Sequence, residues 1–316
     1  MVEPMDPRLR PLNAVLALVN EDGAWFHDLA DQGFQLYAIE LKVQSSAGLV
    51  VADAVVFRQD PELVLLCEGK SGRSLNEPQA RRYVAADAAA LRRGGSLPVS
   101  LSPAADVCPL FVVTNDARAD VEAALQDFEI EAPVLSIDRG FVRLDGPCPA
   151  GLEPFLRRTE SGPKRWPPAR VRVDHQSPLE ELAELLAQQI AAAQANRQPV
   201  LDLAEAASRI YRRWPALSQS GRRDFLRRLA DCARHLARGS LRGTIRVEPS
   251  SNNMPPRIMI TRTPANLDPR GMPQAWQGQA RRMADDLGRT GGSPPEEEKQ
   301  LSLDDLDLGE SEDIDA

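Results

Sequence analysis

Three strand-like segments follow one another early in the chain, with only short turns between them. They span residues 36–44, 49–58 and 62–69. The first alternates apolar and polar side chains, whereas the third is almost continuously apolar, as in strands buried on both faces. Because strands joined by short turns usually pair antiparallel, this succession predicts a three-stranded meander at the centre of the fold.

Helical patterns lie on both sides of this meander. Residues 12–34 predict a helix, or two short helices because Gly23 interrupts the pattern, and residues 79–92 predict another. A further strand at 109–114, a helix at 116–128 and more strand at 133–144 follow. The sequence therefore predicts an α/β domain over residues 1–145, in which helices flank a mixed sheet.

Charged residues stand in the apolar strands. Asp53 lies inside the second strand, and Glu68 and Lys70 end the third, two residues apart and so on one face. Burying such charges is costly unless they are paired or bind a metal. Asp53, Glu68 and the carbonyl of Gly69 form a hard oxygen site suited to Mg²⁺ or Mn²⁺, and Lys70 could act on a phosphate or a water molecule.

The pattern Asp53…Glu68-x-Lys70 resembles the catalytic signature of the PD-(D/E)xK nuclease superfamily. Gln79-Ala-Arg-Arg-Tyr83 on the next helix resembles the QxxxY element of its RecB-like branch. The resemblance covers roughly residues 10–145 and implies a restriction-endonuclease-like fold, a Mg²⁺- or Mn²⁺-dependent deoxyribonuclease, and catalytic roles for Asp53, Glu68, Lys70, Gln79 and Tyr83. It also implies that Arg82 helps position DNA.

The match has departures, and plainer interpretations remain open. Ala52, not proline, precedes Asp53. Glu21 and Glu40 are candidates for an additional acidic residue, and His27 for a histidine ligand. In the plainer interpretation Glu68 and Lys70 form a solvated strand end and Asp53 faces a turn. Gln79 and Tyr83 then belong to an ordinary helix surface, and His27 is a satisfied, partly buried histidine.

The second half of the chain has a different composition. Residues 146–177 are rich in proline and arginine and predict a linker. Residues 178–263 contain three helical segments followed by two short strands, which predicts a winged-helix-like DNA-binding domain with residues 249–256 as the wing. Residues 264–316 are poor in apolar side chains, and we expect them to be disordered.

Charge is distributed unevenly. Residues 296–316 carry ten acidic residues and one lysine, a formal charge of -9, so the remainder of the chain, whose total is -8, sums to +1. Eleven arginines and two aspartates lie between Arg209 and Arg246. Guanidinium groups bind phosphate well. The predicted DNA contacts in this block are Arg212, Arg213, Arg222, Arg223, Arg227 and Arg228.

The same charges are compatible with several other roles. The arginines could form a solvated helix face or meet an acidic partner. The tail, with its repeated Leu and Asp, could recruit a partner protein, compete with DNA for the arginines, or only aid solubility. A second copy of the chain, in a homodimer, is another candidate partner.

The resulting hypothesis is a metal-dependent DNA nuclease, the cutting subunit of a DNA-processing or antiviral defence system. The alternative is a non-catalytic DNA-binding adaptor whose acidic tail recruits a partner. The sequence shows no pattern typical of a signal peptide or a membrane span. Four scattered cysteines without a CxxC pair fit a reducing compartment, so we expect a cytoplasmic protein without a membrane partner.

Overall fold

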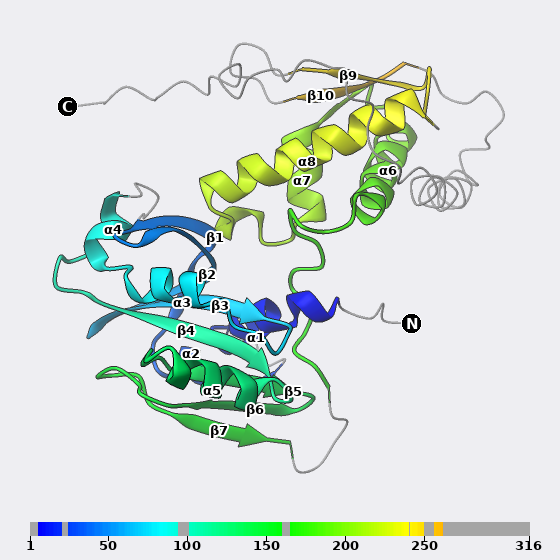
Figure 1. Ribbon diagram of the computed structural model, residues 1–316. Helices are drawn as coiled ribbons and strands as arrows, with labels where there is room; N and C mark the ends of the chain where they lie inside the picture. Colours follow the sequence, from blue (N-terminus) through cyan, green and yellow to red (C-terminus); the bar gives the residue numbers. More distant parts are fainter. Residues whose placement is uncertain are drawn as a thin grey trace. The chain divides into compact units, whose positions relative to one another are not determined.

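The chain divides into two compact units, each with its own β-sheet (Figure 1). The computed structural model describes residues 6–20, 25–93, 101–159, 165–239, 241–249 and 256–261. The first unit comprises Met1–Arg172 with Arg212–Arg223, and the second comprises Val173–Tyr211 with Asp224–Ala316. Within the described residues, no helix is both long and apolar enough to cross a bilayer.

The first unit contains a seven-stranded mixed sheet whose strands lie side by side in chain order. The strands are β1 (Gln35–Ser45), β2 (Gly48–Gln59), β3 (Glu62–Lys70), β4 (Asp106–Thr114), β5 (Val134–Asp138), β6 (Phe141–Asp145) and β7 (Phe155–Arg158). Strands β1 to β3 form the predicted antiparallel meander. Strands β3, β4 and β5 run parallel, and β5 to β7 are antiparallel again. The mixed α/β sheet is thus confirmed.

The helices of this unit are shorter than the sequence suggested. They are η1 (Pro7–Leu9), α1 (Arg10–Leu18), α2 (Asp28–Asp31), α3 (Glu77–Val84), α4 (Ala88–Arg93) and α5 (Arg118–Asp127). The helix expected over residues 79–92 is divided because Asp87 starts a new one: its carboxylate accepts the Ala90 N–H at 2.7 Å. The expected 12–34 helix is also divided in two.

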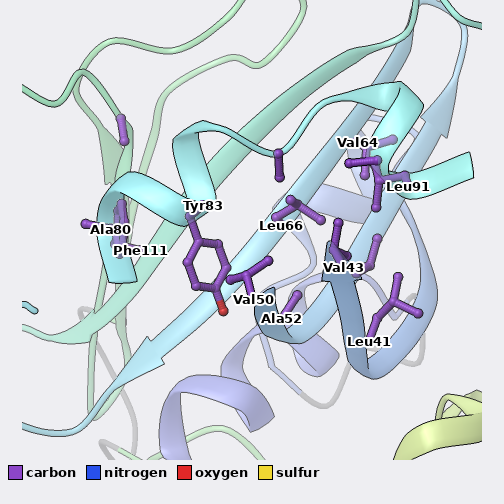
Figure 2. Close-up of a cluster of buried hydrophobic side chains, with 14 of the residues drawn as sticks. Leu41, Val43, Val50, Ala52, Val64, Leu66, Ala80, Tyr83, Leu91 and Phe111 are labelled. Atoms are coloured by element: carbon purple, nitrogen blue, oxygen red, sulfur yellow. The ribbon is translucent and has the colours of Figure 1, made fainter. Parts of the chain in front are cut away.

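Helices α3 and α4 cover one face of the meander. Ala80 and Tyr83 of α3 and Leu91 of α4 share one buried cluster with Leu66 of β3 and Phe111 of β4, and Figure 2 shows these side chains together. Leu63, Leu65 and Cys67 of β3 are buried outside this cluster. Both faces of β3 are therefore covered, as its continuous apolar pattern indicated.

Helix α1 contacts β3 and β4 and is itself held by a later segment. Asn13 is fully buried, and its side-chain amide donates to the carbonyl of Val171 and accepts from the N–H of Val171, both at 2.8 Å. The expected linker 146–177 therefore needs correction. This segment contains strand β7, and part of it belongs to the first unit. The prediction missed this because proline and arginine content describes local composition and carries no information on long-range strand pairing.

The described part of the second unit contains three helices and a small sheet. Its elements are α6 (Leu179–Ala195), β8 (Val200–Asp202), α7 (Leu203–Ile210), α8 (Gln219–Arg238), β9 (Ile245–Glu248) and β10 (Arg257–Ile260); the short η2 (Trp214–Ala216) and the first turn of α8 belong to the first unit. The sheet order is β8-β10-β9, all antiparallel. Most of the expected wing loop, residues 250–255, lies outside the described residues. The acidic tail lies entirely outside them.

Candidate active site

Strands β2 and β3 stop pairing where their charged residues begin. The last paired residues are Ala54 and Cys67, so Asp53 and Glu68 come next on their strands. Beyond this point the Asp53 carboxylate replaces a strand carbonyl: its Oδ2 accepts the N–H of Gly69 at 2.7 Å. Asp53 is thereby fixed against the end of β3 that carries Glu68.

The alternation of buried side chains along β2 is interrupted at Asp53. Val50, Ala52 and Val55 all belong to the buried cluster under α3 and α4. In a regular strand every second residue faces the same side, so the two residues between Ala52 and Val55 break the alternation. This break allows Asp53 to turn toward β3 although its neighbours remain buried.

Glu68, Lys70 and Gln79 form a closed triangle of polar contacts. Lys70 Nζ lies 2.7 Å from Glu68 Oε1 and donates to Gln79 Oε1 at 2.7 Å. Gln79 Nε2 donates to the same Glu68 Oε1 at 2.6 Å. The Glu68 and Lys70 side chains are only 7% and 17% exposed, so this charged pair is held away from bulk solvent and has a fixed geometry.

Helix α3 supplies two side chains to this network from one face. Asn76 caps the helix by accepting the Gln79 N–H at 2.9 Å. Tyr83 follows Gln79 by four residues and is fully buried. Its hydroxyl contacts the carbonyl of Val51 at 2.6 Å and the second oxygen of Glu68. Tyr83 thus belongs both to the core and to the polar network, and Figure 2 shows its ring beside Val50 and Ala52.

The electrostatic environment of Asp53 disfavours its charged form. Burial, followed by the negative charge of Glu68, raises the pKa of Asp53 to about 8, although the Gly69 N–H opposes this shift. Burial also raises the pKa of Tyr83 well above its usual value. A bound cation would stabilise the charged form of this buried carboxylate. The oxygen donors of the site therefore fit a divalent metal.

Gly69 is needed for close packing at this site. A Cβ atom there would lie 2.8 Å from Pro11 Cβ of α1 and 3.2 Å from Asp53 Oδ2. Any side chain at this position would therefore push α1 or the Asp53 carboxylate away. The glycine lets helix and strand approach closely while its N–H holds Asp53.

The structure assigns other partners to two further candidates, Arg82 and His27. Arg82 donates to the carbonyls of Pro78 and Leu49, at 3.0 and 3.1 Å, and so links α3 to the start of β2. His27 precedes α2, where its Nδ1 lies 3.8 Å from an Asp31 oxygen. Glu21 lies outside the described residues.

The carboxylates do not form a larger acidic cage. Among the residues that the structure describes, no group of three or more His, Cys, Asp or Glu side chains is arranged to hold a metal ion. The candidate metal ligands are therefore the two expected carboxylates, Asp53 and Glu68, with the carbonyl of Gly69, the residue after Glu68.

The arginine block separates into structural and surface side chains. Arg222 donates to the carbonyls of Trp214 and Pro215, at 3.2 and 2.7 Å, and Arg228 donates to the carbonyl of Ser177 at 2.8 Å. These two stabilise local structure. Arg212 is exposed, and Arg213 is half-buried just before η2.

Helix α8 carries a stripe of exposed arginines. Its members are Arg223, Arg227, Arg234 and Arg238. Their spacings of four, seven and four residues place them on one side of the helix. Two have acidic neighbours in the same helix: Arg227 lies 3.4 Å from Asp224 and Arg234 bonds Asp231 at 2.5 Å. Such exposed pairs are weak and exchange easily for other anions.

Comparison with known proteins assigns no family to the chain: no protein-family model, no curated protein and no solved structure matches it. The interpretation of the site therefore depends on its residues and their geometry.

One acidic residue close to Asp53 had little support from the sequence as a member of the site. Glu40, an extra acidic candidate on β1, lies opposite Asp53, since Ile39 pairs with Ala54 and Leu41 with Ala52.

Proposed function

We propose that this chain is a divalent-metal-dependent DNA nuclease that hydrolyses phosphodiester bonds at Asp53, Glu68 and Lys70. The observation that carries the proposal is the convergence of five polar residues. Asp53, Glu68, Lys70, Gln79 and Tyr83 come from two strands and a helix, yet hydrogen bonds and ion pairs join the last four, and Asp53 bonds the residue between Glu68 and Lys70. The helix–meander–helix–strand order of the unit supports the resemblance to PD-(D/E)xK nucleases.

Each side chain has a distinct role in this proposal. Asp53 and Glu68, with the Gly69 carbonyl, would hold Mg²⁺ or Mn²⁺, which polarises the scissile phosphate and promotes ionisation of the attacking water. The Lys70 ammonium would orient that water or donate to a phosphate oxygen as negative charge develops. Gln79 fixes Lys70 and Glu68 relative to each other, and Tyr83 fixes the remaining oxygen of Glu68.

DNA is the proposed substrate because of the arginine stripe of α8. Nucleic-acid affinity comes largely from cationic side chains that neutralise phosphates. The three helices and the β9–β10 hairpin support a winged-helix-like interpretation of the second unit, in which α8 meets the DNA. The structural roles of Arg222 and Arg228 make the exposed arginines the better candidates for contacts.

A cleavage assay with matched variants tests the proposal. Purified protein is incubated with plasmid, linear single-stranded DNA and RNA, with Mg²⁺ or Mn²⁺, beside Asp53→Asn and Lys70→Met. We expect the wild type to cleave DNA and each variant to lose at least about 10²-fold in rate. Variants that cut as fast as the wild type would refute this site.

One observation favours a second function. Both oxygens of Glu68 already have protein partners, Lys70 and Gln79 on one and Tyr83 on the other. A network satisfied in this way suits a structural role in a DNA-binding adaptor that recruits a partner through its acidic tail. Titration with Mn²⁺ in the absence of DNA separates the two, because the adaptor needs no metal at Asp53 and the nuclease does.

A further inference from the structure

Strand β1 has a backbone irregularity directly opposite Asp53. Glu40 adopts a φ of +54°, in the left-handed region that residues other than glycine, asparagine and aspartate rarely occupy. Ala38 and Leu41 both belong to the buried cluster, so β1 breaks its alternation at Ile39 and Glu40. The breaks in β1 and β2 thus face each other across the ladder. Such strain persists only where the surroundings enforce it.

A segment far along the chain enforces this conformation. The Ser218 N–H donates to the carbonyl of Ile39 at 2.9 Å, and the Ser218 hydroxyl donates to the carbonyl of Glu40 at 2.6 Å. The same hydroxyl accepts the Gly221 N–H at 3.0 Å, which makes Ser218 the cap of α8. Ser218 therefore fastens the first turn of α8 to β1 at Glu40.

The Glu40 side chain lies against this first turn. Glu40 is only 6% exposed, and a Cβ atom at Gly221 would lie 3.1 Å from its Oε2. The N-terminus of a helix carries partial positive charge, which favours a carboxylate. The helix end thereby offsets part of the cost of burying this anion next to the site.

The charge of Glu40 also reaches Asp53. It is one of the groups that raise the pKa of Asp53, after burial and the Glu68 charge. The carboxylates of Glu68 and Glu40, on the two strands beside β2, therefore both act on Asp53. In the proposed site only Asp53 and Glu68 are candidate metal ligands. Any cation held by those two would be attracted by the third negative charge as well.

We propose that Glu40 is a positioning residue of the metal site: its carboxylate, held in place by Ser218 and the first turn of α8, strengthens divalent-metal binding at Asp53 and Glu68 without ligating the metal. This inference rests on the proposed metal-dependent function. It differs from a purely structural role, in which Glu40 only caps α8. The two roles predict different results when the charge alone is removed.

The decisive measurement is Mn²⁺ binding by calorimetry to the full chain without DNA, for wild type, Glu40→Gln and Glu62→Gln. Glu62→Gln is the matched control, because this substitution removes the same charge from the opposite end of β3. We expect Glu40→Gln to weaken Mn²⁺ binding on the order of tenfold, by loss of a nearby charge. The metal-free unfolding temperature should stay within a few degrees of wild type, and Glu62→Gln should bind Mn²⁺ as the wild type does.

A second pair of variants covers the case in which Glu40→Gln fails to fold. Aspartate and asparagine both tolerate left-handed backbone and differ only in charge. Glu40→Asp should bind Mn²⁺ more tightly than Glu40→Asn at similar stability. Equal Mn²⁺ affinity within either pair, with only stability lowered, would overturn the role of Glu40. Absence of Mn²⁺ binding by the wild type would instead overturn the proposed function itself.

Discussion

At the scale of single residues, the site is defined by charges that the fold keeps close together. Asp53 keeps its proton to unusually high pH because burial and Glu68 oppose ionisation. Lys70 and Gln79 meanwhile compensate Glu68. The site is thus asymmetric: the protein compensates the Glu68 carboxylate, whereas the environment of Asp53 favours its protonated form.

The pKa of Asp53 predicts a pH dependence of stability. Its folded-state pKa is about 8, against 3.8 for an ordinary aspartate. Between these values the folded protein binds the proton more tightly than the unfolded chain, so the free energy of unfolding should fall as pH rises from about 4 to about 8. Unfolding temperatures with a chelator present should show this fall over the range in which the protein stays folded.

Two controls connect this fall to Asp53. Asp53→Asn should remove most of it, because asparagine does not titrate. In the wild type, Mn²⁺ should raise the unfolding temperature more at pH 8.5 than at pH 6, since the metal replaces the proton. A wild-type stability that is flat between pH 5 and 8 would contradict the assigned environment.

The contacts of the Tyr83 hydroxyl with Val51 and Glu68 predict that substitutions at Tyr83 and Glu68 have non-additive effects on stability. Tyr83→Phe leaves the half-buried Val51 carbonyl and one Glu68 oxygen without this partner, which should cost about 1–3 kcal/mol in the free energy of unfolding. Urea unfolding measures this cost. In a Glu68→Gln background the loss should be smaller, because one of the two contacts is already altered. Strict additivity would argue against a shared network.

At the scale of elements, close approach decides where the site can form. Helix α1 packs on β3 at Gly69, and α3 brings Gln79 and Tyr83 to the other face of the strand end. Between them, β2 and β3 separate and release Asp53 from the ladder. The site is therefore a consequence of three elements meeting at one strand terminus.

Gly69 provides a test of this packing. Gly69→Ala should destabilise the protein by about 1–3 kcal/mol, because the added methyl group would overlap Pro11 of α1. Gly72→Ala is the matched control, since a Cβ there meets no atom within 4 Å, and its effect should stay within about 0.5 kcal/mol. Chemical denaturation of both variants checks the difference, and equal stabilities would contradict the tight contact.

We expect the arginines of α8 to divide into two classes, one that contacts DNA and one that stabilises the fold. Replacing the exposed Arg223, Arg227 and Arg234 by alanine should weaken DNA binding by about tenfold or more and lower the salt dependence of the affinity, at unchanged unfolding temperature. Arg228→Ala should instead lower the unfolding temperature, because Arg228 bonds the Ser177 carbonyl. Fluorescence anisotropy at two salt concentrations, with thermal unfolding, distinguishes the classes. An unchanged DNA affinity in the triple variant would refute the stripe as the contact surface.

At the scale of the whole molecule, charge is segregated along the chain. The formal charge of -8 conceals a final segment of -9 and a remainder of +1. If α8 binds DNA as proposed, a polyanionic segment on the same chain should compete with DNA at a high local concentration. Net charge alone would therefore give a misleading impression of the binding properties of this protein.

Deletion of residues 296–316 tests this competition. The shortened chain should bind a DNA duplex more tightly at low salt, on the order of tenfold, and the advantage should shrink as salt screens the charges. A variant with the ten acidic residues of the segment replaced by asparagine or glutamine keeps its length and serves as control. Identical DNA affinity for all three proteins at low salt would show that the segment does not compete.

The sequence alone determined the central strands of this protein and the approximate positions of several helices, because periodicity and turn residues are properties of near neighbours. It specified the β1–β3 meander and placed Asp53 inside one strand and Glu68 and Lys70 at the end of its neighbour. The QxxxY spacing correctly placed Gln79 and Tyr83 on one face of α3.

Only the tertiary structure decided how these elements meet. The addition of β7, the Asn13 contact with Val171 and the fastening of Glu40 by Ser218 depend on contacts that local patterns do not encode, and the last two join residues more than 100 positions apart. The left-handed Glu40 is strained locally and persists only because distant hydrogen bonds hold it. Local patterns contain no information about such contacts, since their stability comes from packing between segments that are remote in the chain.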